Sequence, residues 1–442
     1  MKQFLSLILL CCTLGIAQNP TYNQFDSYLE TLDESNKFMG SVAISQNNGL
    51  LHKKSVGDSY RSESNNQKIN SQSKFRIGSI TKTFTATMIF QLIEEGKISL
   101  GTYLSEFFPQ IPNASKITID HLLTHSSGLF NLTNANQFGD WVYKPTTKKE
   151  MISRMLLFDV DFQPGEKNEY SNTNYLLLGY IIEALDGRTY GQSLEKRIVK
   201  KLKLTNTLYG SKINNKNNEC VSFVFSGNDW EQAGETHMSL PGGAGAIIST
   251  AEELTIFMDG LFNHELINES SLKAMTTYNE LGYCKGIFRI VFQEQEIYVH
   301  DGGIDGFQSL LAYFPQNKAS IALTSNALNY DKRGIVMNAF KATMGLTFDI
   351  PKFTEITLTE TEVKQYEGVY ESETLPYDLI FKADGIILTG APEGDNLKAL
   401  LAISKDEFTF DKIGVHLKFD LTANTLIFTH GDNPSVLFTK KL

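Results

Sequence analysis

Two neighbouring runs near the start of the chain, residues 40–45 and 50–56, mix apolar and polar positions as half-buried strands do. Asn48-Gly49 stands between them, and this pair favours the tight turn of a hairpin. The pattern therefore predicts a β-hairpin ahead of the long helical part of the chain.

From about residue 80 to 275, apolar residues recur mainly at helical spacing. Strand-like runs return afterwards, at residues 286–299, 309–314 and 320–324. Strands at both ends of a helical insert predict an α/β (α+β) fold. In this fold an antiparallel sheet is flanked by helices, and a mainly helical lobe lies beside it.

The pattern changes after Pro351, where short strand-like runs alternate with turn signals. The turns carry Asp-Gly or Gly-Asp pairs, at Asp384-Gly385, Gly394-Asp395 and Gly431-Asp432. Such spacing is typical of an all-β meander or a small antiparallel barrel. We therefore expect a second domain, a C-terminal β-barrel, at about residues 355–442.

The first 17 residues (1–17) have the composition of a secretory signal peptide. Lys2 supplies the positive charge, residues 5–14 the apolar stretch, and a small-residue cleavage site follows. Lipid attachment at Cys11 or Cys12 is a weaker alternative, since neither cysteine follows the small residue that such signals favour. No later segment has the length of a membrane span. We expect an exported protein, periplasmic or secreted.

The net charge and the histidine spacing argue against a nucleic-acid partner and against a zinc site. The net charge is −10 and we see no basic cluster, which argues against a nucleic-acid partner. His121 and His125 are spaced like a metal pair, but the glutamate of a His-Glu-x-x-His zinc site is absent. We expect these histidines to fix the turn that follows them, and we predict no metal and no cofactor. The sequence gives no indication of oligomeric state.

Two cysteines, Cys220 and Cys284, would remain after removal of a signal peptide. In an oxidising compartment they could form a disulfide, provided that the fold brings them close together. Two unpaired, buried thiols are an equally good interpretation. Both alternatives stay open from the sequence.

Ser79-Ile80-Thr81-Lys82 places a hydroxyl and an amine one helical turn apart. Residues three apart on a helix share a face, so Lys82 can reach the Ser79 oxygen. A desolvated lysine can take the proton of a serine hydroxyl and make it a nucleophile. The same spacing also occurs at Ser71–Lys74 and Ser193–Lys196, so it acquires meaning only from other motifs.

Two such motifs follow in order, Tyr170-Ser171-Asn172 and His300-Asp301-Gly302-Gly303. Together with Ser79-x-x-Lys82 they resemble the motifs of the penicillin-recognising serine hydrolases: Ser-x-x-Lys, Tyr-x-Asn, and Lys-, His- or Trp-x-Gly. The nearest resemblance is to the branch that holds class C β-lactamases, DD-peptidases, D-aminopeptidases and related esterases.

Two flanking stretches, residues 117–129 and 241–250, match the same family. The resemblance covers about residues 25–345 and implies that the three motifs meet in a cleft between the helical lobe and the sheet. The segment at 355–442 resembles the small lipocalin-like barrel that is appended to many such hydrolases.

The resemblance implies an acyl-enzyme mechanism, in which Ser79 attacks an amide or ester carbonyl and water later releases the acyl group. Lys82 is either the first base or the group that keeps Tyr170 ionised as a second base, and both assignments stay open. We expect cations at Lys82 and at a protonated His300 to lower the pKa of the Tyr170 phenol. Tyr170 would then pass a proton from Ser79 to the leaving group.

The developing charge on the carbonyl oxygen needs fixed donors. By family position these are the backbone N–H groups of Ser79 and Gly303, with Gly302 letting the backbone approach the substrate closely. Asn172 is expected to hold Lys82 and to contact the substrate amide, and Asn131 to reach the same amide.

His300 departs from the β-lactamase pattern, in which a lysine commonly supplies a permanent cation for the substrate carboxylate. Family members with histidine at this position are often esterases or peptidases. We therefore expect a D-amino-acid peptidase, a DD-peptidase or an esterase that acts on a small-molecule or peptide substrate. A β-lactamase ranks below these. A slow-turnover receptor that binds a penicillin or a peptide covalently is the alternative of another class.

Overall fold

The computed structural model describes residues 20–62, 66–227, 229–292 and 294–441. The segment predicted to be a signal peptide, residues 1–17, lies outside the described residues. Within the described chain, no helix is long and apolar enough to cross a bilayer.

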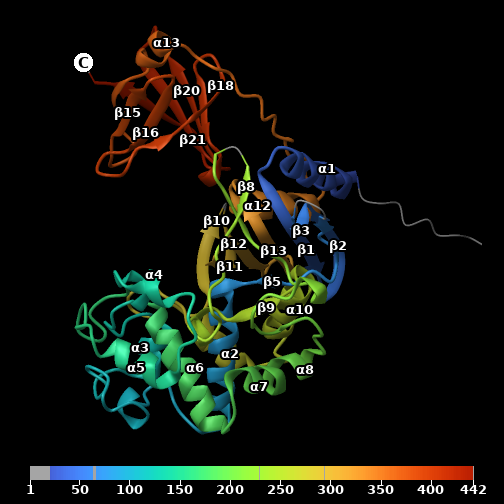
Figure 1. Cartoon of the computed structure of the whole chain (residues 1–442), viewed down its shortest axis with the longest axis vertical. Helices are drawn as coiled ribbons and strands as arrows, with labels where there is room; N and C mark the ends of the chain where they lie inside the picture. Colours follow the sequence, from blue (N-terminus) through green and yellow to red (C-terminus); the bar gives the residue numbers. More distant parts are fainter. Residues whose placement is uncertain (1–19, 63–65, 228, 293, 442) are drawn as a thin grey trace, which may run out of the picture.

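A six-stranded antiparallel sheet lies in the middle of the molecule, in the order β10-β11-β12-β13-β1-β2 (Figure 1). Its strands are β1 (Phe38–Gln46), β2 (Gly49–Val56), β10 (Phe288–Phe292), β11 (Gln295–Ile304), β12 (Phe307–Phe314) and β13 (Ala319–Leu328). The N-terminal hairpin therefore joins the strands that follow the helical insert, as the strand patterns at both ends of the insert predicted.

The hairpin turns one residue earlier than predicted. Asn47 and Asn48 have φ of 50° and 66°, and Gln46 pairs with Gly49 across the strands. Positive φ at both central residues is the geometry of a type I′ turn, and asparagine tolerates it. The predicted hairpin is confirmed, but the predicted Asn48-Gly49 turn is wrong because Gly49 already belongs to β2.

Helices cover both faces of this sheet. On one face lie α1 (Pro20–Glu34) and α12 (Lys332–Thr343), and on the other lie α2 (Thr81–Glu94) and α10 (Ala251–Phe262). Successive residues of a strand point to opposite faces. Accordingly, Val42 and Ile44 of β1 pack in the core under α1 and α12, and Ala43 packs in the core on the α2 side.

The helical lobe occupies the lower part of Figure 1 and packs around α2. Its helices are α3 (Ile119–Leu123), α4 (Phe138–Trp141), α5 (Lys148–Met155), α6 (Asn172–Asp186), α7 (Tyr190–Leu194), α8 (Lys200–Leu202), α9 (Gly242–Gly245) and α11 (Glu269–Thr276). The remaining strands form three small antiparallel sheets. They are β3-β4, β5-β9-β6 and β7-β8, with the strands β3 (Asp58–Tyr60), β4 (Gln67–Lys68), β5 (Phe75–Arg76), β6 (Leu208–Tyr209), β7 (Phe223–Phe225), β8 (Trp230–Gln232) and β9 (Ile247–Ser249).

The C-terminal part forms a nine-stranded antiparallel sheet that curls into a nearly closed barrel, in red in Figure 1. A short helix, α13 (Glu360–Lys364), precedes strands β14 (Gly368–Glu371), β15 (Leu379–Asp384), β16 (Ile387–Pro392), β17 (Lys398–Ala399), β18 (Leu401–Ser404), β19 (Glu407–Phe410), β20 (Val415–Asp420), β21 (Thr425–His430) and β22 (Val436–Lys440). Gly385, Gly394 and Gly431, which the turn signals singled out, all have positive φ between strands. The predicted barrel is confirmed.

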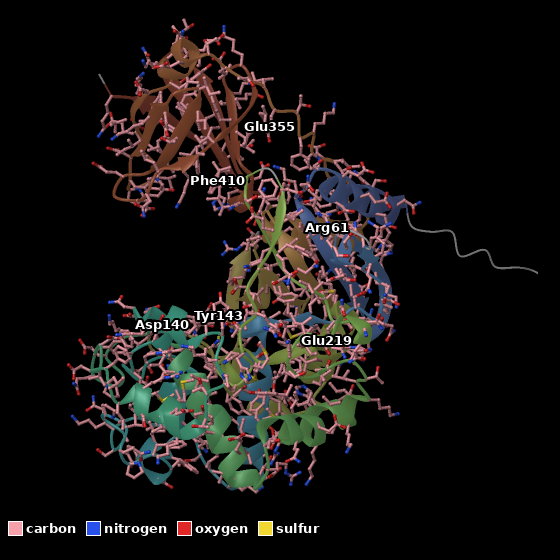
Figure 2. The ribbon with its side chains drawn as sticks, viewed as in Figure 1. Arg61, Asp140, Tyr143, Glu219, Glu355 and Phe410 are labelled. Atoms are coloured by element: carbon pink, nitrogen blue, oxygen red, sulfur yellow. The ribbon has the colours of Figure 1, made fainter. Side chains whose placement is uncertain are left out.

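The barrel has a core of its own. Ion pairs join it to the rest of the chain, namely Lys37 Nζ with Asp411 Oδ2 at 2.8 Å and Lys341 Nζ with Asp432 Oδ1 at 2.7 Å, and the first of these is largely buried. Figure 2 shows Phe410, next to Asp411, at the end of the barrel nearest the central sheet, and Glu355 on the connecting segment. The two free cysteines, Cys220 and Cys284, are both buried, so the interpretation as unpaired thiols holds.

Candidate active site

Ser79 lies where strand β5 turns into helix α2. A 3-10 turn, η1 (Gly78–Ile80), carries it, and Lys82 is in the first turn of α2. The helical spacing brings Lys82 Nζ to 2.9 Å from Ser79 Oγ, as the sequence predicted. Ser79 is partly exposed, whereas the Lys82 side chain is completely buried.

The Lys82 amine has three hydrogen-bond partners at this site. Besides the Ser79 hydroxyl, Asn172 Oδ1 and the Ala244 carbonyl each lie 2.8 Å from Nζ, and both can only accept. Nζ is the donor in all three hydrogen bonds. Burial lowers the pKa of Lys82 well below its ordinary value, which shifts the group toward the neutral amine.

Tyr170 approaches Ser79 from the opposite side. Its phenol donates a hydrogen bond to Ser79 Oγ at 2.9 Å, and its ring lies 4.9 Å from Lys82 Nζ. Burial raises the pKa of Tyr170 rather than lowering it. The predicted lowering is wrong because burial desolvates the phenol, and desolvation penalises the charged phenolate.

Asn172 begins helix α6 and is held in one orientation. Its amide nitrogen donates to Asn131 Oδ1 at 3.3 Å and to Thr133 Oγ1 at 3.2 Å, so its oxygen must face Lys82. Its backbone N–H donates to Asn131 Oδ1 at 3.0 Å. The side-chain oxygen of Asn131, Oδ1, thus accepts hydrogen bonds from Asn172. The adjacent Leu132 and Thr133 line the cleft.

The glycines of β11 permit a close approach between this strand and the turn before α2. A Cβ at Gly302 would lie 2.1 Å from Ile77 O and 3.0 Å from Ser79 N. At Gly78, with φ of +50°, a Cβ would lie 2.7 Å from Gly303 N. Gly302 therefore lets β11 approach the backbone around Ser79, and this approach brings Gly303 beside the turn that carries the nucleophile.

His300 is buried in β11 with its ring 5.2 Å from that of Phe288. Its Nδ1–H donates to Asp301 O at 2.7 Å, which fixes the tautomer. Burial and the nearby Lys82 hold the pKa of His300 well below its usual range, so the ring is neutral at pH 7. On the same strand the Asp301 carboxylate pairs with Lys332 Nζ at 2.9 Å.

A cavity of about 310 Å³ opens beside Ser79, and it is mostly apolar. Its walls are Gly78, Ser79, Leu132, Thr133, Phe138, Trp141, Met151, Asn172, Leu176, Thr236, Leu240, Pro241, Ala244, Gly245, Gly303, Ile304 and Asp305. The charged member of this set, Asp305, pairs with Arg76 at 2.8 Å and accepts hydrogen bonds from Thr236, and Arg76 also pairs with Glu235 at 2.7 Å. None of the described residues that line the cavity is a cation.

Sequence reasoning missed several contributors. The Ala244 carbonyl belongs to the glycine-rich stretch 241–245, whose side chains give no sign that a backbone oxygen is used. Thr133 and Lys332 act through other residues, and no sequence motif marks such partners. Gly78 could have been found, since a glycine just before a nucleophile at a sharp turn is a known signal.

The two histidines with metal-like spacing, His121 and His125, accept hydrogen bonds from backbone N–H groups. His121 Nδ1 accepts from Thr118 N–H at 3.2 Å and so caps α3. His125 accepts from Ser171 N–H at 3.1 Å. Among the residues that the structure describes, no cluster of His, Cys, Asp or Glu could hold a metal ion.

Comparisons with known proteins agree with this geometry. The sequence model of the family described as Beta-lactamase matches residues 25–343. PbpX of Bacillus subtilis (strain 168), which is named as a penicillin-binding protein, is 26% identical over 328 residues, 72% of this chain and 80% of that one. The teichoic acid D-alanine hydrolase of Staphylococcus aureus is 30% identical over 195 residues, 44% of this chain and 45% of that enzyme.

The match to the teichoic acid D-alanine hydrolase spans less than half of that Staphylococcus aureus enzyme. Among solved structures, a D-stereospecific amidohydrolase from Streptomyces sp. is similar with a TM-score of 0.60 and 26% identity, over 73% of this chain and 98% of that one. The family match covers well over half of the chain and includes all three motifs. The chain therefore belongs to the Beta-lactamase family and is a serine hydrolase.

Proposed function

We propose that this enzyme cleaves amide or ester bonds of D-amino acid derivatives through an acyl intermediate on Ser79. The observation that carries the proposal is the position of Ser79 Oγ, which lies 2.9 Å from Lys82 Nζ and 2.9 Å from the Tyr170 phenol, at the edge of an apolar cavity. The names of the Staphylococcus aureus and Streptomyces relatives support the D-configured acyl group.

In the acylation step, the neutral Lys82 amine takes the Ser79 proton while Oγ attacks the carbonyl carbon. The negative charge that forms on the carbonyl oxygen meets the backbone N–H groups of Ser79 and Gly303. Tyr170, which keeps its proton, donates that proton to the leaving amine or alcohol, and the proton held by Lys82 replaces it. Water then repeats these transfers in reverse order and releases the acid.

The residues that line the cavity restrict the class of substrate that fits it. Its aromatic and aliphatic walls, among them Trp141 and Met151, suit an apolar acyl side chain. It offers no free cation for a substrate carboxylate, because none of its described lining residues is basic and the nearby Arg76 is paired with both Asp305 and Glu235. This favours amides and esters over substrates that end in a free carboxylate, and it places β-lactams, which carry one, lower.

A covalent receptor is the second candidate, and the name of the Bacillus subtilis relative favours it. Both functions begin with acylation of Ser79 and differ in the release of the acyl group. A labelled protein that recovers within seconds is a catalyst, whereas a label that persists for hours identifies a receptor.

The direct test compares Ser79→Ala with Ser71→Ala after exposure to a fluorophosphonate and to a fluorescent penicillin. Ser71 has the same Ser-x-x-Lys spacing but is exposed on the surface, so it is a matched control. We expect Ser79→Ala to lose all covalent label and Ser71→Ala to keep it. Label retained on Ser79→Ala would end the nucleophile assignment. Hydrolysis of D- and L-alanine or phenylalanine amides, p-nitrophenyl esters and nitrocefin then ranks the substrates.

We also propose that the protein is exported and that its domains span residues 25–345 and 355–442. The apolar stretch after Lys2 supports export. The separate barrel core supports the domain division. N-terminal sequencing of the mature protein and limited proteolysis between residues 345 and 355 test these two statements.

A further inference from the structure

Tyr170 occupies a position that regular secondary structure does not hold. It lies between α5 and α6, outside any helix or strand, and directly precedes Ser171, the N-cap of α6. Its phenol must nevertheless stay within hydrogen-bond distance of Ser79. A displacement of about 1 Å at such a group can lower a rate by on the order of 100-fold. Something outside the segment therefore has to fix it.

Three contacts from a single residue, His125, surround Tyr170. The His125 carbonyl accepts from Glu169 N–H at 2.8 Å, and its Nδ1 accepts from Ser171 N–H at 3.1 Å. The His125 ring lies against the Tyr170 ring, with centroids 4.4 Å apart and 32° between the planes. The backbone on both sides of Tyr170 and its aromatic ring are thus held by one side chain and its own peptide.

His125 is itself held in an unusual conformation. Its φ is +56°, in the left-handed region that non-glycine residues adopt uncommonly, although asparagine, aspartate and histidine do so more often than the others. Asn174 of α6 places Nδ2 3.3 Å from the same Nδ1, and Ser127 Oγ donates to Asn174 Oδ1 at 2.6 Å. The His125 ring is therefore held by groups on both α6 and the turn that follows the histidine.

The ring of His125 is neutral. An Nδ1 that accepts from Ser171 N–H needs its lone pair, so the single ring proton is on Nε2. Burial, together with the nearby Lys82 and His300, holds the pKa of His125 well below its usual value. A neutral ring adds no positive charge beside Tyr170, which agrees with a phenol that keeps its proton.

We propose that His125 is the positioning residue of Tyr170: it fixes the backbone on both sides of the tyrosine and the tilt of its ring, so that the phenol points at Ser79. This inference rests on the proposed role of Tyr170. It goes beyond that role because His125 contacts neither Ser79 nor the lining of the cavity.

A double-mutant cycle tests the proposal. We expect His125→Ala to lower the acylation rate on the order of 100-fold. In a Tyr170→Phe background, which has no phenol to aim, the same substitution should lower the residual rate no more than about threefold. A residue that only stabilises the fold would lower both rates by the same factor. Equal factors in the two backgrounds, or a His125→Ala rate close to that of the wild type, would overturn the inference.

His125→Asn separates the contacts and protects the test against misfolding. Asparagine tolerates positive φ and its Oδ1 can accept from Ser171 N–H, but it lacks the ring. We expect it to restore most of the lost rate if the backbone contact dominates, and to show the same dependence on Tyr170 if His125→Ala does not fold. His121→Ala is the matched control, since it uncaps α3 and should change the melting temperature but not acylation.

The outcomes also separate this inference from the proposed function. If Tyr170→Phe alone acylates at the wild-type rate, the role of Tyr170 is wrong whatever His125 does. If Tyr170→Phe is slow and the two His125→Ala factors are equal, the catalytic role stands and only the positioning inference falls.

Discussion

The most direct test that Lys82 is the base is a substitution that places a negative charge beside its amine and changes the side-chain shape very little. Asn172→Asp replaces the acceptor that lies 2.8 Å from Lys82 Nζ by a carboxylate. An effective dielectric constant near 20 gives an attraction of about 6 kcal/mol at this distance, or roughly four pKa units. Part of it is offset because the new carboxylate is itself desolvated and faces the Asn131 oxygen.

We therefore expect the pKa of Lys82 to rise by about two units or more in Asn172→Asp. The amine must be neutral to take the serine proton, so the acid limb of the rate profile moves to higher pH by the same amount. At neutral pH the acylation rate falls by about 100-fold or more, and it recovers in alkali. Stopped-flow acylation by a p-nitrophenyl ester across the pH range measures the limb.

Asn131→Asp is the matched control, because it adds the same charge on the far side of Asn172, where the retained Oδ1 keeps the donors from Asn172 and the new oxygen replaces the Nδ2 that donates to the exposed Asn134. The acid limb of the pH–rate profile should move less in Asn131→Asp than in Asn172→Asp. An unchanged limb in a folded Asn172→Asp protein would refute the reasoning, since the titration that limits the rate would then not be that of Lys82.

Three further predictions follow from the geometry. Gly302→Ala should abolish folding or acylation, because its new Cβ would lie 2.1 Å from a backbone oxygen. Gly303→Ala should keep measurable acylation, because its Cβ would meet only a flexible glutamine side chain at 3.2 Å. Thermal melts and covalent labelling compare the two variants. His125 and His300 are buried with pKa values below the unfolded value of 6.5, so the unfolded chain binds more protons below that pH. The free energy of unfolding should then fall by about 1.4 kcal/mol per pH unit for each of them until the folded pKa is passed, as urea titrations would show; a flat profile from neutral to pH about 5 contradicts it. Trp141→Ala enlarges the apolar cavity and should lower kcat/KM for phenylalanine derivatives by about tenfold or more, with little change for alanine derivatives; equal losses on both would show that Trp141 does not contact the acyl side chain.

Several features follow from local sequence alone. Residues three apart share a face wherever the segment is helical, so the contact between the Ser79 hydroxyl and the Lys82 amine was predictable once the later motifs singled out this Ser-x-x-Lys. Strand patterns at both ends of the helical insert predicted the mixed fold, and the turn pairs after Pro351 predicted the barrel. Periodicity and turn chemistry are properties of a few neighbouring residues, which is why the sequence specifies them.

Other features depend on what the fold places nearby. The pKa of Tyr170 was predicted in the wrong direction because burial, which the sequence does not display, outweighs the charges that were expected around it. The orientation of Asn172 depends on Asn131 and Thr133, 39 to 41 residues away. The Ala244 carbonyl reaches Lys82 from 162 residues away without any side chain to mark it.

The sequence by itself therefore determined which reactive groups this hydrolase has and which two of them are neighbours. Only the tertiary structure decided their protonation states, their orientation and the mostly apolar cavity that they face. The physical reason is that spacing along the chain is local, whereas desolvation and hydrogen-bond geometry are sums over atoms that folding brings together from distant segments.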